Sequence, residues 1–261
     1  VGFEENYITY AKYKEYIRKF KINNFVETEY IIEKQRMIKD DDELSSIIKA
    51  CNVTDDCFKH ITNYIKPGMT EKQIAKEIEN YYTQNAEGLS FETIVASGEN
   101  SSKPHAVPTD RKIQEKDIIT IDMGCKVNGY CSDMTRTIFV GEPTEKMKKV
   151  YDLVLNNQKF ALDQYKDGAN ARQITKMVES NFKLNGGYLI HSLGHGVGLE
   201  IHELPYMSYR FDTMLRENMV VTDEPGIYIP GKFGVRIEDT VQITKFGCIS
   251  LTNSEKNYII I

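Results

Sequence analysis

The most regular hydrophobic pattern lies in residues 39–65, where apolar side chains recur at helical spacing. The recurring residues are Leu44, Ile47, Ile48, Cys51, Phe58, Ile61 and Ile65. This spacing predicts a long amphipathic helix, which Pro67 and Gly68 stop. A second helix is predicted from Thr70, whose capping box is completed by Gln73.

The same arrangement returns 100 residues further along the chain. The segment KPGMTEKQI begins at Lys66 and matches KDGANARQI, which begins at Lys166. We expect a long helix before each segment, at about residues 145–166 in the second copy. After each segment we expect a glycine turn and a strand, FETIVASG in the first copy and YLIHSLG in the second. The pattern favours two similar α/β halves, with chance similarity of two helix caps as the alternative.

A hairpin is predicted for residues 118–141, where two β-rich runs flank Asn128 and Gly129. Both central residues of a type I′ turn need positive φ, and Asn-Gly is the strongest short signal for such a turn. With these two residues as the loop, Asp122 shares a face with Asp133, about 6 to 8 Å away at Cβ. The two carboxylates are therefore placed to converge on metal ions; the alternative is two solvated aspartates at the edge of a hairpin.

Five potential metal ligands lie in segments that have the character of strands and tight turns. They are Asp122, Asp133, His195, Glu224 and Glu238. Four are carboxylates, and two such charges about 4 Å apart repel each other by on the order of 4 kcal/mol at an effective dielectric near 20. Because only cations make such a cluster tolerable, these residues predict a metal site at the interface of the two halves.

Composition and charge argue against several classes of partner. The 261 residues carry a formal net charge of −5, and basic residues are interspersed with acidic ones, so we expect no nucleic-acid partner. No apolar stretch approaches the roughly 20 residues that span a bilayer, and no signal-peptide pattern opens the chain. We expect a soluble cytoplasmic protein with no membrane contact. The five cysteines include no C-x-x-C pair, which favours buried thiols in a reducing cytosol over disulfides.

The first residues have a different character from the rest. VGFEENYIT reads as a strand and AKYKEYIRKF as a helix, and together they look like the last elements of a larger domain. We therefore expect residues 1–35 to be the remnant of a truncated N-terminal domain and residues 36–261 to form the catalytic domain.

Five segments between Ser97 and Thr244 resemble, in the right order, the pita-bread metallopeptidase family, which includes methionine aminopeptidase, aminopeptidase P and prolidase. They are SGENSSKPHAVP, IDMGCKVNGYCSDMTRT, HSLGHGVGLEIHELP, TDEPGIYIP and GVRIEDTVQIT. The resemblance implies the pita-bread (creatinase/aminopeptidase) fold, an α/β (α+β) architecture of two pseudo-symmetric halves with a dinuclear metal site between them.

The resemblance also implies roles for the predicted ligands. Asp133 and Glu238 bridge two divalent ions, Asp122 completes one site, and His195 and Glu224 complete the other. A water or hydroxide between the ions attacks the peptide carbonyl, and Glu224 takes its proton. An oxygen-rich site with one imidazole suits Mn²⁺, with Co²⁺ or Zn²⁺ as substitutes.

Three of the remaining histidines fall within the matching segments. By resemblance, His105 and His202 donate hydrogen bonds to the substrate or to the tetrahedral intermediate. His191 lies four residues before His195. His60, on the first long helix, is expected to be structural.

The branch of the family is indicated by His191, Tyr228 and Arg236. His191 and Arg236 look like the proline-handling branch, aminopeptidase P and prolidase, and disfavour methionine aminopeptidase. An Xaa-Pro bond has no N–H, so recognition must use the ring shape and donors to carbonyl or carboxylate groups. Tyr228 and His191 are expected to shape the proline pocket, and Arg236 to anchor a carboxylate or the peptide backbone. The alternative for Arg236 is a salt bridge that orients Glu238 or Asp239.

The leading hypothesis is a metal-dependent exopeptidase that cleaves an N-terminal Xaa-Pro bond, so its partner is a peptide with proline in the second position. The resemblance further implies a homodimer for the full-length protein. One alternative is methionine aminopeptidase, and another is a non-catalytic peptide-binding module on the same fold. Asp223 departs from the family pattern, which usually has an apolar residue beside Glu224, and we expect it to point away from the metals.

Overall fold

The computed structural model describes residues 1–21 and 24–261 and divides into two compact units, Val1–Arg36 and Met37–Ile261. The first unit contains strands β1 (Gly2–Glu4) and β2 (Val26–Thr28) and helices α1 (Tyr10–Phe20) and α2 (Ile31–Arg36). β1 and β2 pair in parallel. The predicted strand and helix are present, while β2 and α2 were not predicted. No residue of these two helices is buried.

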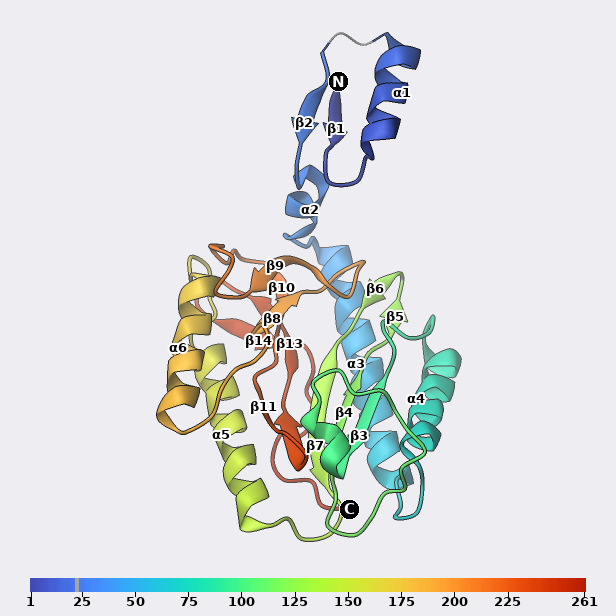
Figure 1. Cartoon of the computed structure of the whole chain (residues 1–261), viewed down its shortest axis with the longest axis vertical. Helices are drawn as coiled ribbons and strands as arrows, with labels where there is room; N and C mark the ends of the chain where they lie inside the picture. The colour runs from blue at the N-terminus through green and yellow to red at the C-terminus, as the bar shows by residue number, and fades with distance from the viewer. Residues whose placement is uncertain (22–23) are drawn as a thin grey trace. The chain divides into compact units, whose positions relative to one another are not determined.

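The first half of the larger unit packs two helices against a three-stranded sheet (Figure 1). Its helices are α3 (Asp41–Tyr64) and α4 (Glu71–Asn85), and the sheet order is β3 (Ile94–Ser97), β4 (Ile118–Met123) and β7 (Met134–Phe139). A short 3-10 helix, η1 (Gly98–Ser102), follows β3. A capping box begins α3, where the Asp40 side chain accepts from the backbone of Glu43 and the Glu43 side chain accepts from the backbone of Asp40.

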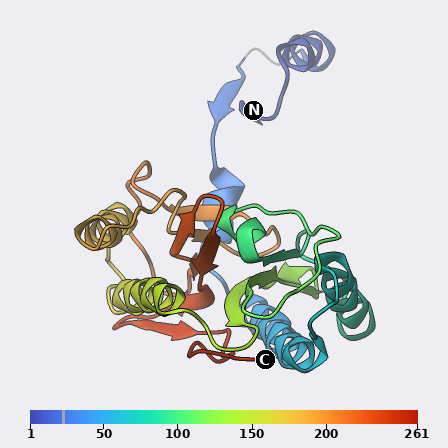
Figure 2. The same cartoon turned by 60° about the horizontal axis from the view of Figure 1, so that its bottom comes forward.

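The second half repeats this plan. Its helices are α5 (Glu145–Leu162) and α6 (Ala171–Leu184). The sheet has the order β14 (Cys248–Ser250), β13 (Asp239–Ile243), β10 (Val220–Asp223), β8 (Gly194–Gly196) and β9 (Glu203–Met207). A separate hairpin joins β11 (Gly226–Ile229) to β12 (Phe233–Arg236). Figures 1 and 2 show α3 and α4 on one outer side of this unit, α5 and α6 on the other, and the strands between them.

Backbone hydrogen bonds confirm the internal repeat. Thr70 caps α4 and Asn170 caps α6, each accepting from the backbone N–H of the glutamine three positions on. The Gly68 N–H donates to the Ile113 carbonyl at 2.8 Å, and the Gly168 N–H donates to Leu215 at 2.9 Å. Each helix cap is therefore tied in the same way to a segment roughly 45 residues further on, as a duplicated supersecondary unit requires.

Two boundary predictions for the second half are wrong. The segment YLIHSLG forms no strand before Gly194, because Tyr188 and Ile190 are 65% and 61% exposed and have no sheet face to cover. The helix expected to reach about residue 166 ends at Leu162, where the chain turns with a hydrogen bond from the Gln164 N–H to the Ala161 carbonyl.

The predicted hairpin register is confirmed. Strands β5 (Lys126–Val127) and β6 (Tyr130–Cys131) flank Asn128 and Gly129, whose φ angles are 53° and 80°. Val127 pairs with Tyr130 in this short ladder, and Asp122 pairs with Thr135 in the separate ladder of β4 and β7. The two ladders keep the same register, which is the register that puts the side chains of Asp122 and Asp133 on one face. All five cysteines are free thiols.

Arg136 joins the two halves in the interior. Its side chain is buried and donates to Asp239 Oδ1 at 2.7 Å, to the backbone carbonyl of Glu238, and to the Ser254 carbonyl at 2.8 Å. These contacts connect β7 of the first half with β13 and the C-terminal segment of the second. No helix among residues 1–21 and 24–261 has the length and apolarity needed to cross a bilayer.

Replacing Arg136 with methionine is expected to lower the free energy of unfolding by roughly 2–4 kcal/mol. The substitution leaves buried Asp239 with Lys256 as its remaining ion-pair partner, and it removes the donor to the Glu238 and Ser254 carbonyls. Urea denaturation of the metal-free protein measures this loss. The matched control is Lys148→Met, which removes a surface pair with Glu142 and should change stability little. Equal stability of both variants would contradict the role assigned to Arg136.

Candidate metal centre and catalytic cleft

A cleft of about 760 Å³ lies between the two halves, and both contribute to its walls. It is lined by all five residues that the sequence nominated as ligands, and by four of the five nominated substrate-facing residues. These are Asp122, Asp133, His195, Glu224, Glu238, His105, His191, His202 and Arg236. Tyr228 stands behind this wall, where its hydroxyl is 3.0 Å from His191 Nε2. The structure therefore brings the nominated residues into one site.

Each candidate ligand lies within a strand or directly beside one. Asp122 is on β4, Asp133 immediately precedes β7, and His195 is the central residue of β8. Glu224 follows β10, and Glu238 connects β12 to β13. The glycines on either side of His195 allow the backbones to meet closely, because an added Cβ would lie 2.1 Å from the Thr222 carbonyl oxygen at Gly194 and 2.3 Å from that of Leu204 at Gly196.

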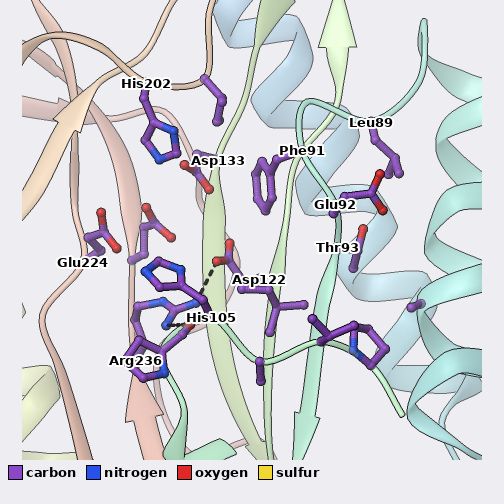
Figure 3. A pocket seen from close by; sticks show the side chains of 18 of the residues that line it. Leu89, Phe91, Glu92, Thr93, His105, Asp122, Asp133, His202, Glu224 and Arg236 are labelled. Atoms are coloured by element: carbon purple, nitrogen blue, oxygen red, sulfur yellow. Dashed lines mark hydrogen bonds and ion pairs between the residues drawn. The ribbon is translucent and has the colours of Figure 1, made fainter. Parts of the chain in front are cut away.

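Three buried residues form the centre of the cluster. Asp133, His195 and Glu238 each offer one ligand atom, and these atoms all lie within 4.8 Å of one another. His195 Nε2 is 3.4 Å from Asp133 Oδ2 and 3.5 Å from Glu224 Oε1. Figure 3 shows the carboxylates of Asp133, Asp122 and Glu224 around the same space. This spacing suits carboxylate and imidazole ligands that surround cations rather than bond directly to one another.

The protonation state of the His195 ring is compatible with metal binding. Its Nδ1 lies 3.1 Å from the Gly196 carbonyl oxygen, which only accepts, so Nδ1 carries the proton. Burial lowers the pKa of His195 to about 3, so the ring is neutral near pH 7. The lone pair of Nε2 is therefore free to face the carboxylates, which is the arrangement that a backbone acceptor imposes on metal-ligating histidines.

The carboxylates oppose one another electrostatically. Burial, together with the charges of neighbouring acids, raises the pKa of Asp133 and of Glu238 well above the usual range. Burial raises the pKa of Glu224 to about 7. Asp122 has one oxygen, Oδ1, that is buried without a hydrogen-bond partner. Divalent cations would supply the missing partner and neutralise the repulsion, so the residues present fit bound metal ions.

Arg236 pairs with Asp122, which corrects the expected alternative of a salt bridge to Glu238 or Asp239. Its Nη2 is 2.7 Å from Asp122 Oδ2, and its Nε donates to Thr135 Oγ1 at 3.1 Å. The Arg236 side chain passes Thr135 on β7 to reach β4, whereas Asp239 is bound by Arg136. A residue pattern alone does not say which strand lies within reach of the arginine.

A second set of contacts joins Arg236 to the predicted proline-facing residues. Arg236 Nη1 donates to the Tyr228 hydroxyl at 2.7 Å and to the Pro104 carbonyl at 3.0 Å. The rings of His191 and Tyr228 meet edge to face at 5.5 Å between centroids. Burial lowers the pKa of His191 to about 4, so it is neutral at pH 7. The wall formed by His191, Tyr228 and Arg236 is therefore held by its own hydrogen bonds before a ligand enters.

Two further histidines face the same space. The His202 ring lies 4.2 Å from the His195 ring, centroid to centroid. Burial lowers the pKa of His202. In Figure 3, His105 lies near Asp122 and Arg236, while Leu89, Phe91, Glu92 and Thr93 form the opposite wall. Sequence reasoning missed this wall, because its residues lie in an irregular segment before β3 and carry no motif.

Asp223 faces away from the cleft. Its side chain is fully buried, and Oδ1 accepts a hydrogen bond of 3.4 Å from the Tyr165 hydroxyl. It pairs across the strands with Asp239, on the side of the sheet opposite to its neighbour Glu224. Burial raises the pKa of Asp223 well above the usual range. Asp223 is therefore a buried polar residue of the second half, and its side chain does not join the candidate ligands.

Comparison with known proteins gives a consistent picture. The sequence model of metallopeptidase family M24 matches residues 45–245. The chain is 41% identical to the Xaa-Pro dipeptidase of Pyrococcus furiosus, over 98% of this chain and 74% of that protein.

Solved structures agree over the whole chain. A structure of an Xaa-Pro dipeptidase from Bacillus anthracis superposes with a TM-score of 0.95 at 41% identity, covering 100% of this chain and 74% of that one. An X-Pro aminopeptidase from Thermotoga maritima gives a TM-score of 0.93 at 36% identity, covering 100% and 75%. The chain therefore spans about three quarters of each of these proteins.

The metal-free protein is expected to lose stability as the pH rises from about 6.5 to 8, where the raised carboxyl pKa values leave the folded state with more bound protons than the unfolded chain. The free energy of unfolding falls with pH under that condition. His191, His195 and His202 oppose this trend only at the lower end of the interval, because their pKa values are lowered by folding and an unfolded histidine loses its proton mainly between about pH 6 and 7.5.

Thermal unfolding at several pH values, with and without saturating Mn²⁺, measures the effect. Tm should fall with rising pH in the metal-free protein, and Mn²⁺ should abolish the fall. Glu224→Gln, which removes one titrating carboxyl, should flatten the metal-free curve. A metal-free Tm that rises over this interval would refute the electrostatic description.

Proposed function

The chain belongs to metallopeptidase family M24 and has the pita-bread fold that the sequence predicted, and on this premise we propose that it hydrolyses the bond between an N-terminal residue and a following proline. The observation that carries the proposal is the buried cluster of Asp133, His195 and Glu238 beside the wall of His191, Tyr228 and Arg236. The first set supports metal-dependent hydrolysis, and the second supports proline recognition.

A metallopeptidase of this family uses divalent metal ions, and we propose two, most simply Mn²⁺, with Co²⁺ or Zn²⁺ as substitutes. Asp133 and Glu238 would be shared between them, Asp122 would complete one position, and His195 and Glu224 the other. When bound, such ions activate a water molecule at neutral pH and polarise the scissile carbonyl. The orphaned Asp122 Oδ1 and the raised carboxyl pKa values are what support this assignment.

Glu224 is the proposed general base. Its carboxylate lines the cleft, and Oε1 lies 3.5 Å from His195 Nε2, so a water molecule held at the cluster would lie beside a group that can accept its proton. It would take the proton of the attacking water at its carboxylate and deliver it to the departing proline nitrogen. His105 and His202 would donate hydrogen bonds to the oxygen on which negative charge develops, which is the usual source of electrostatic stabilisation in acyl transfer.

Proline selection is assigned to the preformed wall. The Xaa-Pro amide has no N–H, so the site must recognise the proline ring and the carbonyl or carboxylate beyond it. His191 offers a ring to the cleft, and the Tyr228 hydroxyl supports His191 and Arg236 by hydrogen bonds. Arg236 offers a guanidinium that is already oriented by Asp122 and Pro104. Because this wall is ordered without a ligand, little side-chain freedom would be lost on binding.

We further propose that residues 36–261 form the catalytic domain, with residues 1–35 belonging to a separate N-terminal domain, that the full-length protein is a cytoplasmic homodimer, and that its partner is a peptide with proline in the second position. The names of similar proteins include both a dipeptidase and an aminopeptidase. Methionine aminopeptidase activity and a purely binding role are less well supported, because these relatives are named for Xaa-Pro or X-Pro cleavage and all five candidate ligands are present.

Release of free amino acid from Ala-Pro, Ala-Pro-Ala and Met-Ala-Ser tests the proposal. Metal-stripped protein should cleave none of them, and added Mn²⁺ should restore cleavage of the two proline peptides only. The ratio of dipeptide to tripeptide cleavage separates the two types of relative. Cleavage confined to Met-Ala-Ser would contradict the proline assignment, and inactivity with bound Mn²⁺ would favour a binding module.

Glu224→Gln is expected to lower kcat for Ala-Pro by on the order of 10²- to 10⁴-fold, because the amide cannot accept the water proton. KM should change far less. The manganese content of the variant must be measured in parallel, since a loss of metal would lower activity for a different reason. Activity close to that of the unaltered protein at full metal content would remove Glu224 as the base.

A further inference from the structure

A buried carboxylate outside the ligand cluster binds the segment that carries His105. Glu71, the first residue of α4, is 0% exposed. Its Oε1 accepts from the Ser97 N–H at 2.6 Å and the Ser97 hydroxyl at 2.7 Å. Its Oε2 accepts from Asn100 Nδ2 at 2.9 Å, the Thr109 N–H at 2.9 Å and the Thr109 hydroxyl at 2.7 Å. One carboxylate thus receives five hydrogen bonds.

These bonds hold both ends of one loop. Ser97 ends β3, Thr109 lies twelve residues further on, and His105 is between them. The middle of the loop reaches the second half, where Ser101 Oγ accepts from the Gly234 N–H at 2.9 Å and the Pro104 carbonyl accepts from Arg236. Glu71 therefore holds the two ends of the loop together in the first half, while the middle of the loop contacts the second half.

The position of His105 depends on this loop. Its side chain is exposed in the cleft, and among residues 1–21 and 24–261 no hydrogen bond holds its ring. The other cleft histidines have close partners, since His191 and His195 bond to backbone carbonyls and His202 packs on the His195 ring. The position of the His105 ring is therefore determined by the backbone of its loop.

The internal repeat shows that the capped helix start and its backbone contact can form without this carboxylate. The equivalent of Glu71 in the second half is Ala171. The backbone contact is the same, with the Glu71 N–H donating to Arg111 at 3.2 Å and the Ala171 N–H donating to Thr213 at 2.9 Å. The segment after β8 in the second half also carries a cleft histidine, His202, but that ring packs on His195. The carboxylate therefore accompanies the loop whose histidine has no such ring contact.

We propose that Glu71 is a positioning residue that sets His105 in the cleft by binding both ends of the loop from Ser97 to Thr109. Its catalytic consequence rests on the proposed function, in which His105 donates to the substrate. The proposal makes glutamine an informative substitution. Each carboxylate oxygen accepts one backbone N–H, so either orientation of an amide turns its NH₂ toward a backbone donor and leaves that donor without an acceptor.

The first measurement is hydrogen exchange of Glu71→Gln in the Mn²⁺-loaded full chain. Peptides covering residues 97–109 should exchange faster than in the unaltered protein, while those covering β4 should not change. The matched control is Glu77→Gln, the same substitution on the same helix, at a carboxylate that contacts His60. Unchanged exchange of the loop in Glu71→Gln would overturn the proposal.

The second measurement is a double-mutant cycle with His105→Ala, using Ala-Pro. Misplacement of a catalytic side chain by about 1 Å can lower activity by on the order of 100-fold, so Glu71→Gln should lower kcat/KM by about tenfold or more at unchanged manganese content. In the His105→Ala background it should have less than about a twofold effect, because its route of action is already removed. A full effect in that background would show a general structural role and overturn the proposal.

A variant with a milder change tests the proposal even if Glu71→Gln fails to fold. Thr109→Val removes one hydroxyl donor to Glu71 and keeps the backbone N–H donor, so it should give the same pattern at smaller amplitude. The two measurements also separate this proposal from the proposed function. If the unaltered protein cleaves no Xaa-Pro peptide, the proposed function fails, while the exchange experiment still decides whether Glu71 holds the loop.

Discussion

Repulsion among buried carboxylates is the constraint on which this structure depends. Asp133 and Glu238 are buried with Asp122 and Glu224 beside them, and burial together with mutual repulsion raises the pKa of Asp133 and of Glu238. A folded chain accepts such an arrangement only when cations or protons neutralise it. The neutral imidazole of His195, which directs Nε2 toward the cluster, would add a ligand without adding charge. The site is thus built for cations.

The two halves hold this unfavourable group together from opposite sides. The first half supplies two aspartates from one hairpin, and the second supplies the histidine and both glutamates from strand ends. Two buried arginines compensate further negative charge around the cluster. Arg236 occupies one oxygen of Asp122, and Arg136 binds Asp239 and the backbone of Glu238. The same arginines fix the strands, so the electrostatic compensation and the fold depend on each other.

Local chemistry explains which parts could be predicted from the sequence. Asn128 and Gly129 determine the turn, and with it the register that puts Asp122 and Asp133 on one face. The caps at Thr70 and Asn170 are local and were found through the repeat. The candidate ligands were also accessible, because they lie in segments that resemble one metallopeptidase family; that they bind metal stays a prediction.

Interactions over long distances in the sequence were not accessible. The partner of Arg236 depends on which strand of the other half lies within reach of its side chain. Glu71 reads as an ordinary first-turn acid of a helix, and only its contacts with Ser97, Asn100 and Thr109 reveal its setting. The segment at Tyr188 and Ile190 has the composition of a strand, but it has no neighbour to pair with and stays exposed.

The carboxylates and His195 are proposed to bind a pair of cations. Equilibrium dialysis of metal-stripped protein against Mn²⁺, with metal and chain concentrations measured independently, gives the number of ions bound. Two ions per chain are expected for the unaltered protein, and both should be lost in Asp133→Asn, because this residue would be shared between the ions. Binding of no ions, or binding that Asp133→Asn leaves intact, would contradict the proposal.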